Sequence, residues 1–180
     1  MHKYILLLRR EFWQSKKILN KNNPIDFIEE YVLNYEIEKV RDSRDEIIIF
    51  SKGVWRNYDI SFRWDNKKKI IEIITYFEMS KKNRINKSIY SLISGVNKKA
   101  TVGFFNYCTE LNTVFFSYKI SIKGQDSISV EQIKNFINIV ISECDRFFPV
   151  FFVFFYKKQD PIHALDIALL DTVGEAWHHF

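Results

Sequence analysis

The stretch from Ser129 to Phe148 constrains the fold most, because it predicts a long helix with almost no polar side. Ser129 and Gln132 have the spacing of a capping box, so the helix should begin there. A helix with so little polar surface must be covered, either by the rest of the domain or by a partner. Its apolar stripe recurs every three or four residues, at Val130, Ile133, Ile137, Val140, Cys144 and Phe147, and is widened by Phe136.

Two prolines follow this stretch, and each predicts a different local structure. Pro149 should kink the helix or make it restart, because proline lacks the N–H group that the helix needs. The run from Phe151 to Tyr156 fits a helix or an extended segment equally well. A last helix is predicted with Asp160 as its cap, Pro161 as its first residue and Gly174 as its end.

Before residue 129, segments with the apolar periodicity of helices alternate with segments that have the periodicity of strands. A first helix is predicted from about Pro24 to Tyr35 with Asn23 as its cap, and a second from 83 to 98, in which Gly95 suggests close packing. Strands are predicted at 46–50, 54–64, 69–78, 102–108 and 111–122, with a weak signal at 38–41. The order is therefore helix, three strands, helix, two strands, helix and a C-terminal helix. This order predicts an α+β fold with an antiparallel sheet flanked by helices.

The positive charge lies almost entirely in residues 1–22. This segment holds six basic residues and one acidic residue, a net charge of +5, and the rest of the chain has 21 basic and 21 acidic residues. A neutral body argues against a general nucleic-acid-binding or membrane-binding domain and leaves the basic tail as the segment that could make either contact. The preferred interpretation of residues 1–22 is a solvated extension of the domain.

No pattern of catalytic, cofactor-binding or metal-binding residues is present. The five glycines are scattered, no Cys or His pair has zinc spacing, and His163 has no nucleophile motif around it. Cys108 and Cys144 are too few for a disulfide framework and indicate reduced thiols in a cytoplasmic protein. The Glu143/Asp145 pair is typical of a solvated helix face or of partners for nearby basic residues. We therefore expect no catalytic residues, no cofactor and no metal.

Partner-binding candidates come from two places. Aromatic and arginine residues on a strand are typical of protein interfaces, which selects Trp55 and Arg56, while Tyr58 and Trp64 share an apolar face that favours the core. The apolar helix supplies the other candidates, Phe136, Val140 and Phe147, as a surface for a partner or for a homodimer.

Three segments give the chain a resemblance to a known family. They are NPIDFIEEYVLNYEIE at 23–38, VWRNYDISFRWD at 54–65, and ISECDRFFPVFFVF followed by ALLDTVGEA within 141–176. The chain resembles the YbjN domain proteins, in particular a short alphaproteobacterial branch. The resemblance covers residues 23–176 and implies a YbjN-like domain there, with a short tail at 177–180. The basic N-terminal extension at 1–22 lies outside the resemblance and is a departure from the relatives. The resemblance also implies a fold like that of type III secretion chaperones, with no established catalytic residues.

The resemblance and the composition lead to two predicted functions. The first is a cytoplasmic, non-enzymatic regulator or chaperone-like adaptor of sensory transduction or stress responses that binds a protein client or signalling partner. The second is a nucleic-acid-associated transcriptional regulator whose basic tail supplies the contact. An enzyme of another class would need a pocket with convergent polar groups.

Overall fold

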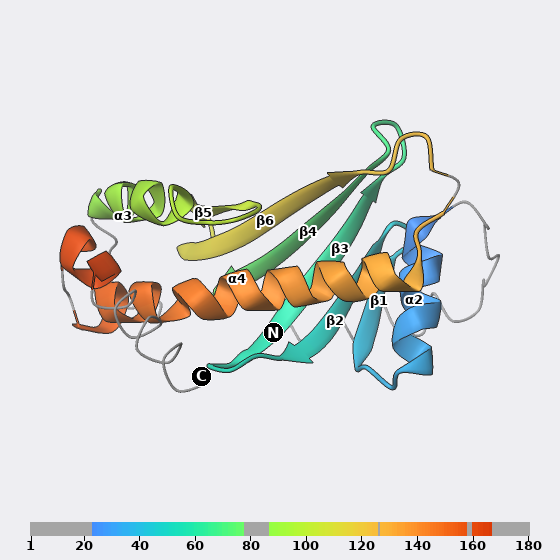
Figure 1. Ribbon diagram of the computed structural model, residues 1–180, viewed down its shortest axis with the longest axis horizontal. Helices are drawn as coiled ribbons and strands as arrows, with labels where there is room; N and C mark the ends of the chain where they lie inside the picture. Colours follow the sequence, from blue (N-terminus) through green and yellow to red (C-terminus); the bar gives the residue numbers. More distant parts are fainter. Residues whose placement is uncertain (1–22, 78–86, 126, 158–159, 167–180) are drawn as a thin grey trace, which may run out of the picture.

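The computed structural model describes residues 23–77, 87–125, 127–157 and 160–166, which form an antiparallel sheet with helices packed on it (Figure 1). The six strands lie in the order β1-β2-β3-β4-β6-β5, and each neighbouring pair is antiparallel. The expected α+β class with an antiparallel sheet is therefore confirmed. The elements in chain order are α2 (Pro24–Asn34), β1 (Lys39–Ser43), β2 (Glu46–Lys52), β3 (Asn57–Asp65), β4 (Ile70–Phe77), α3 (Ser88–Asn97), β5 (Phe104–Cys108), β6 (Thr113–Ser121) and α4 (Val130–Lys157).

The strand count before α3 is four, where three were expected. The additional strand is β1, which forms where the sequence signal at 38–41 was weak. It lies at the edge of the sheet. All five of its residues are half-buried, so the strand lacks the usual alternation of buried and exposed side chains. Arg41 of β1 forms ion pairs with Asp26 at 2.8 Å and Glu29 at 3.2 Å, which tie the edge strand to α2.

Helix α2 begins as its local sequence predicts. The Asn23 side chain accepts a hydrogen bond from the backbone N–H of Ile25 at 2.9 Å, and Pro24 occupies the first turn. The amide of Asn23 also donates to the Asp45 carboxylate at 2.8 Å, at the turn between β1 and β2. The cap therefore fixes both the start of α2 and its position beside the sheet.

Helix α4 runs without interruption through Pro149 and covers the sheet along much of its length (Figure 1). The expected restart at Pro149 is thus wrong, and the run 151–156 is helical. The lost backbone bond costs on the order of 3 kcal/mol. Burial of the neighbouring Phe147, Val150 and Phe151 against the core offsets that cost, since each is fully buried. The capping box is confirmed: Gln132 N–H donates to the Ser129 hydroxyl at 3.1 Å, and Ser129 N–H donates to the Gln132 side chain at 2.9 Å.

An aromatic cluster fills the space between α4 and the β5 end of the sheet. Phe105 is its centre, with ring centroids 5.0–5.8 Å from those of four other phenylalanines, which are Phe77, Phe116, Phe147 and Phe151. All five side chains are fully or almost fully buried. The cluster joins β4, β5 and β6 to α4, so it contributes strongly to the stability of the domain.

The outer edge of β5 is closed by side chains. The amide group of Asn97, the last residue of α3, accepts from Phe105 N–H at 2.7 Å and donates to Phe105 C=O at 2.9 Å. These are the bonds that a further strand would make at this position. Two residues further along β5, the Tyr107 N–H donates to the Asn106 side chain at 2.8 Å. The sheet therefore cannot be extended at β5 without displacing these caps.

Replacing Asn97 with alanine should lower the free energy of unfolding by about 2 kcal/mol, because two hydrogen bonds of about 1 kcal/mol each are lost. Urea unfolding would measure the change. Lys98→Ala is the matched control, since Lys98 is the exposed neighbour at the same helix end. An Asn97→Ala protein that unfolds at the same urea concentration as Lys98→Ala would contradict the role given to this cap.

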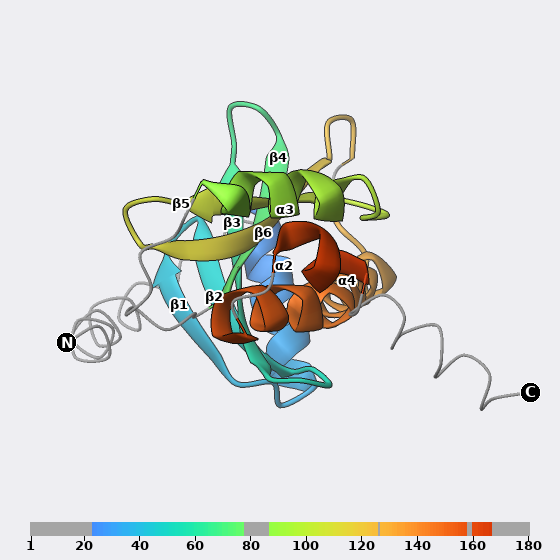
Figure 2. The same ribbon diagram turned by 90° about the vertical axis from the view of Figure 1, so that its left-hand side faces the viewer.

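The start of the predicted C-terminal helix is confirmed. Residues 161–166 are helical, and Asp160 caps them by accepting from Ile162 N–H at 3.0 Å and His163 N–H at 3.1 Å. A Cβ atom at Gly95 would lie 3.0 Å from Leu165, so this turn packs closely on α3, as the glycine suggested (Figure 2). Residues 167–173 of the predicted helix lie outside the described residues. None of the helices in the described ranges is long and apolar enough to cross a membrane.

Candidate protein-docking surface

The five predicted partner-binding residues fall into two separate environments. Phe136, Val140 and Phe147 are buried against the domain's own core, so this part of the apolar stripe of α4 is covered within one chain. Trp55 and Arg56 instead lie in the loop 53–56 between β2 and β3, because β3 begins at Asn57 and not at residue 54. Tyr58 and Trp64 are buried in the core, as expected.

The loop 53–56 is held against α4 by the carboxylate of Asp145. This carboxylate accepts hydrogen bonds from Val54 N–H at 2.8 Å, from Trp55 N–H at 3.4 Å and from the Tyr58 hydroxyl at 2.8 Å. The loop approaches so closely that a Cβ atom at Gly53 would lie 2.3 Å from the Tyr58 ring and 2.7 Å from Asp145. Only glycine leaves room for this approach.

Burial raises the pKa of the Tyr58 phenol well above its ordinary range, and its bond to Asp145 raises it further. Tyr58 therefore remains a hydrogen-bond donor to Asp145 at every pH at which proteins normally work. The guanidinium of Arg56 lies over the Tyr58 ring, 5.9 Å from its centre. These contacts hold the loop against α4.

The fixed loop leaves large apolar side chains in solvent. Val54 is 81% exposed and Trp55 is 55% exposed. On α4, Phe148, Phe152 and Tyr156 follow Asp145 at three, seven and eleven residues, which places them along the same side of the helix. Their rings form a ladder with centroid spacings of 6.1 and 4.8 Å. Phe152 is 39% exposed and Tyr156 is 46% exposed.

We call this set the Trp55 surface; it consists of Val54, Trp55, Phe148, Phe152 and Tyr156. Three basic residues belong to the same segments: Lys52 precedes the loop, Arg56 is its last residue and Lys157 ends α4. None of the three has a carboxylate partner within ion-pair distance among the described residues. The surface is thus apolar and aromatic, with positive charge beside it.

The Glu143/Asp145 pair is not the solvated face that the sequence suggested. Glu143 is buried and accepts from Thr101 N–H at 3.3 Å, after the end of α3. Asp145 holds the loop 53–56, some 90 residues earlier in the chain. Both carboxylates therefore position loops from distant parts of the sequence. A single sequence carries no signal for such contacts, because nothing at either end marks the other.

The histidine and cysteine side chains, which most often act as bases or nucleophiles, lie on different elements of the structure. His163 is exposed, and Cys108 is half-buried, where it donates to the Glu110 carboxylate at 3.3 Å. Cys144 is buried in α4, and burial raises the pKa of its thiol well above the usual value. Within the ranges that the structure describes, no group of three or more His, Cys, Asp or Glu side chains is placed to hold a metal ion.

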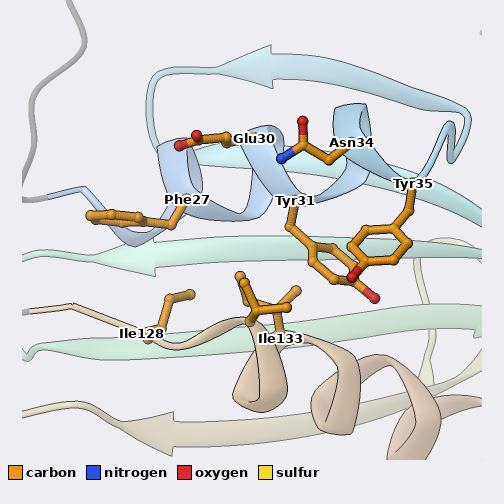
Figure 3. A pocket seen from close by; sticks show the side chains of 8 residues that line it. Phe27, Glu30, Tyr31, Asn34, Tyr35, Ile128 and Ile133 are labelled. Atoms are coloured by element: carbon orange, nitrogen blue, oxygen red, sulfur yellow. The ribbon is translucent and has the colours of Figure 1, made fainter.

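A groove lies between α2 and the start of α4 (Figure 3). This groove has a volume of about 560 Å³. Its walls are mostly apolar and aromatic, with Glu30 and Asn34 along α2, and it is lined by Phe27, Glu30, Tyr31, Asn34, Tyr35, Ile128, Val130 and Ile133. The rings of Tyr31 and Tyr35 lie 4.6 Å apart, and burial raises the pKa of Tyr31, with Tyr35 adding to the effect.

Comparison with known proteins shows to which family the chain belongs. Residues 24–153 match the model of a family named YbjN and described as "Putative bacterial sensory transduction regulator". The chain belongs to the YbjN family. Among curated proteins, none matches this YbjN chain significantly.

Two solved structures resemble this YbjN chain at low sequence identity. A chain from the structure of the HopA1–SchA chaperone–effector complex is 10% identical, with a TM-score of 0.49, and the match covers 71% of this chain and 94% of the other. The crystal structure of YbjN from E. coli, described as "a putative transcription regulator", is 11% identical, with a TM-score of 0.46, covering 67% of this chain and 85% of the other.

Proposed function

We propose that this YbjN protein is a non-enzymatic regulator or adaptor that binds a partner protein through the Trp55 surface. One observation carries the proposal: the Asp145 carboxylate holds the loop 53–56 in place while Trp55 and Val54 remain exposed. A rigid, exposed tryptophan loses little conformational freedom on binding, and for this reason tryptophans are frequent hot spots of interfaces.

The chemistry of the Trp55 surface supports a partner segment that is apolar and acidic. The aromatic ladder of Phe148, Phe152 and Tyr156 offers apolar contact along about two turns of helix. Lys52, Arg56 and Lys157 would then meet carboxylates of the partner at the rim, where opposite charge speeds association and selects between partners.

Addition of a partner strand at β5 is not the mode that we propose. Asn97 already makes both outward-facing backbone bonds of Phe105, and Asn106 takes the N–H of Tyr107. A strand from a client would have to replace these caps before it could pair. Recognition by side chains at the Trp55 surface requires no such rearrangement.

A double substitution tests this function. Affinity-tagged Trp55→Ala/Phe152→Ala protein should recover at least about tenfold less of the specific partner from source-cell lysate than the unaltered protein, since hot-spot truncations cost about 2 kcal/mol each. Quantitative mass spectrometry of nuclease-treated samples would measure the loss. Both side chains are partly exposed, so the fold should be retained.

The matched control is Leu111→Ala/Tyr90→Ala, which removes two exposed apolar side chains elsewhere on the domain. A partner that is lost only with the Trp55 surface supports the proposal. If the same proteins are recovered in equal amounts with both double variants, the Trp55 surface is not the binding site.

The second predicted function, nucleic-acid binding through residues 1–22, rests on the charge of that segment. It remains a prediction. Binding that falls steeply with salt and disappears when residues 1–22 are removed would favour it over protein binding. The cytoplasmic location that we propose is supported by the two free thiols, of which Cys144 is buried.

A further inference from the structure

Helix α2 forms one wall of the groove, where Glu30 is the one acidic lining residue, and it belongs to a stretch of the chain with unpaired acidic charge. Residues 23–38, which cap and form α2 and lead into β1, contain five acidic residues and no basic residue. Arg41 takes up two of these, Asp26 and Glu29. The other three, Glu30, Glu36 and Glu38, are exposed and have no basic partner among the described residues.

The segment that precedes this acidic stretch has the opposite charge. Residues 1–22 carry a net charge of +5, and residues 23–38 carry a net charge of −5. The basic segment also has apolar residues at roughly helical spacing, at Ile5, Leu8, Phe12 and Leu19. The apolar groove walls and the acidic residues beside them are therefore complementary to this segment in both respects.

Chain connectivity makes residues 1–22 the favoured occupant. They lead directly into Asn23, which caps α2, and α2 is itself one wall of the groove (Figure 3). Helix α2 has 11 residues, a length of about 16 Å, whereas 22 residues can span up to about 75 Å, so they can turn back to the groove. A tethered segment has an effective concentration on the order of millimolar, above that of most free competitors.

We infer that the groove between α2 and α4 receives residues 1–22 of the same chain, with their apolar side chains against the groove walls and their basic side chains near Glu30, Glu36 and Glu38. Docked there, the segment covers the groove and partly neutralises the acidic stretch. Any anionic partner of residues 1–22 then has to compete with the protein's own carboxylates. The inference does not depend on the function proposed for the Trp55 surface.

A spin label in the full-length protein tests this inference. Ser15→Cys is labelled with a nitroxide after Cys108→Ser removes the half-buried thiol, and the buried Cys144 is left in place. Methyl signals of Ile133, in the groove, should lose most of their intensity. Those of Leu92 in α3, at the other end of the molecule from α2, should keep theirs (Figure 1).

Two controls separate docking from mere tethering. Glu30→Lys/Glu38→Lys keeps the length of the tether but replaces attraction with repulsion, so the Ile133 signal should recover. If that signal is equally weak in the charge-reversed protein, or is not weakened at all, the inference is wrong. The second control mixes spin-labelled chains with separate isotope-labelled chains, which tests whether residues 1–22 bind the groove of another copy. Broadening of Ile133 in that mixture would assign the groove to the tail of a second copy and overturn binding within one chain.

Discussion

Replacing Phe105 with alanine should lower the free energy of unfolding by about 4 kcal/mol, the typical cost of deleting a buried phenylalanine ring. Phe105 is the centre of the aromatic cluster and contacts the rings of four other phenylalanines. Its removal would leave a cavity where β5, β6 and α4 meet. Chemical denaturation followed by the far-ultraviolet circular dichroism signal would measure the loss.

Phe104→Ala is the control for this prediction, because Phe104 precedes Phe105 in β5 and points to the other face, where it is partly exposed. Its replacement should cost less than about 1 kcal/mol. Equal losses from the two substitutions would mean that the faces of β5 are not assigned correctly.

Removing the Asp145 carboxylate should lower the free energy of unfolding by about 3 kcal/mol and free the loop 53–56. Two of its hydrogen bonds are short, to Val54 N–H and the Tyr58 hydroxyl at 2.8 Å each, and bonds to a charged group contribute about 1.5 kcal/mol or more. In Asp145→Ala, hydrogen exchange at the Val54 and Trp55 amides should become faster. Denaturant unfolding would measure the stability.

Two variants calibrate this result. Asp145→Asn retains one acceptor oxygen and should lose less stability than Asp145→Ala. Ser142→Ala changes an exposed position one turn earlier on α4 and should have almost no effect. Exchange at Val54 that is the same in Asp145→Ala and Ser142→Ala would show that the carboxylate does not hold the loop.

Much of the fold could be predicted because its signals are local. Asn23 followed by Pro24 marks the start of α2, and the Ser129–Gln132 box marks the start of α4. The alternation from Tyr58 to Trp64 shows which face of β3 is buried. Each signal depends on residues within one turn of helix or one strand, where short-range sterics and hydrogen bonds decide the conformation.

The features that could not be predicted depend on tertiary contacts. Pro149 remains inside a helix because buried neighbours on α4 outweigh its local cost. Of the candidate site, Trp55 and Arg56 were anticipated and lie in a loop at the Trp55 surface. Phe152 and Tyr156 were missed because the run 151–156 is apolar on every side, and the sequence does not say which side meets the sheet. Asp145 was missed because its partners lie about 90 residues away.

The dependence of the loop 53–56 on Asp145 also has a consequence during protein synthesis. Val54 and Trp55 leave the ribosome long before α4, and until α4 arrives nothing orders them and the core face of the sheet stays open. The surface that we propose for partner binding is therefore complete only when α4 has docked. If that proposal holds, a chain that ends before α4 should not bind the partner, so partner binding would report that translation has passed α4.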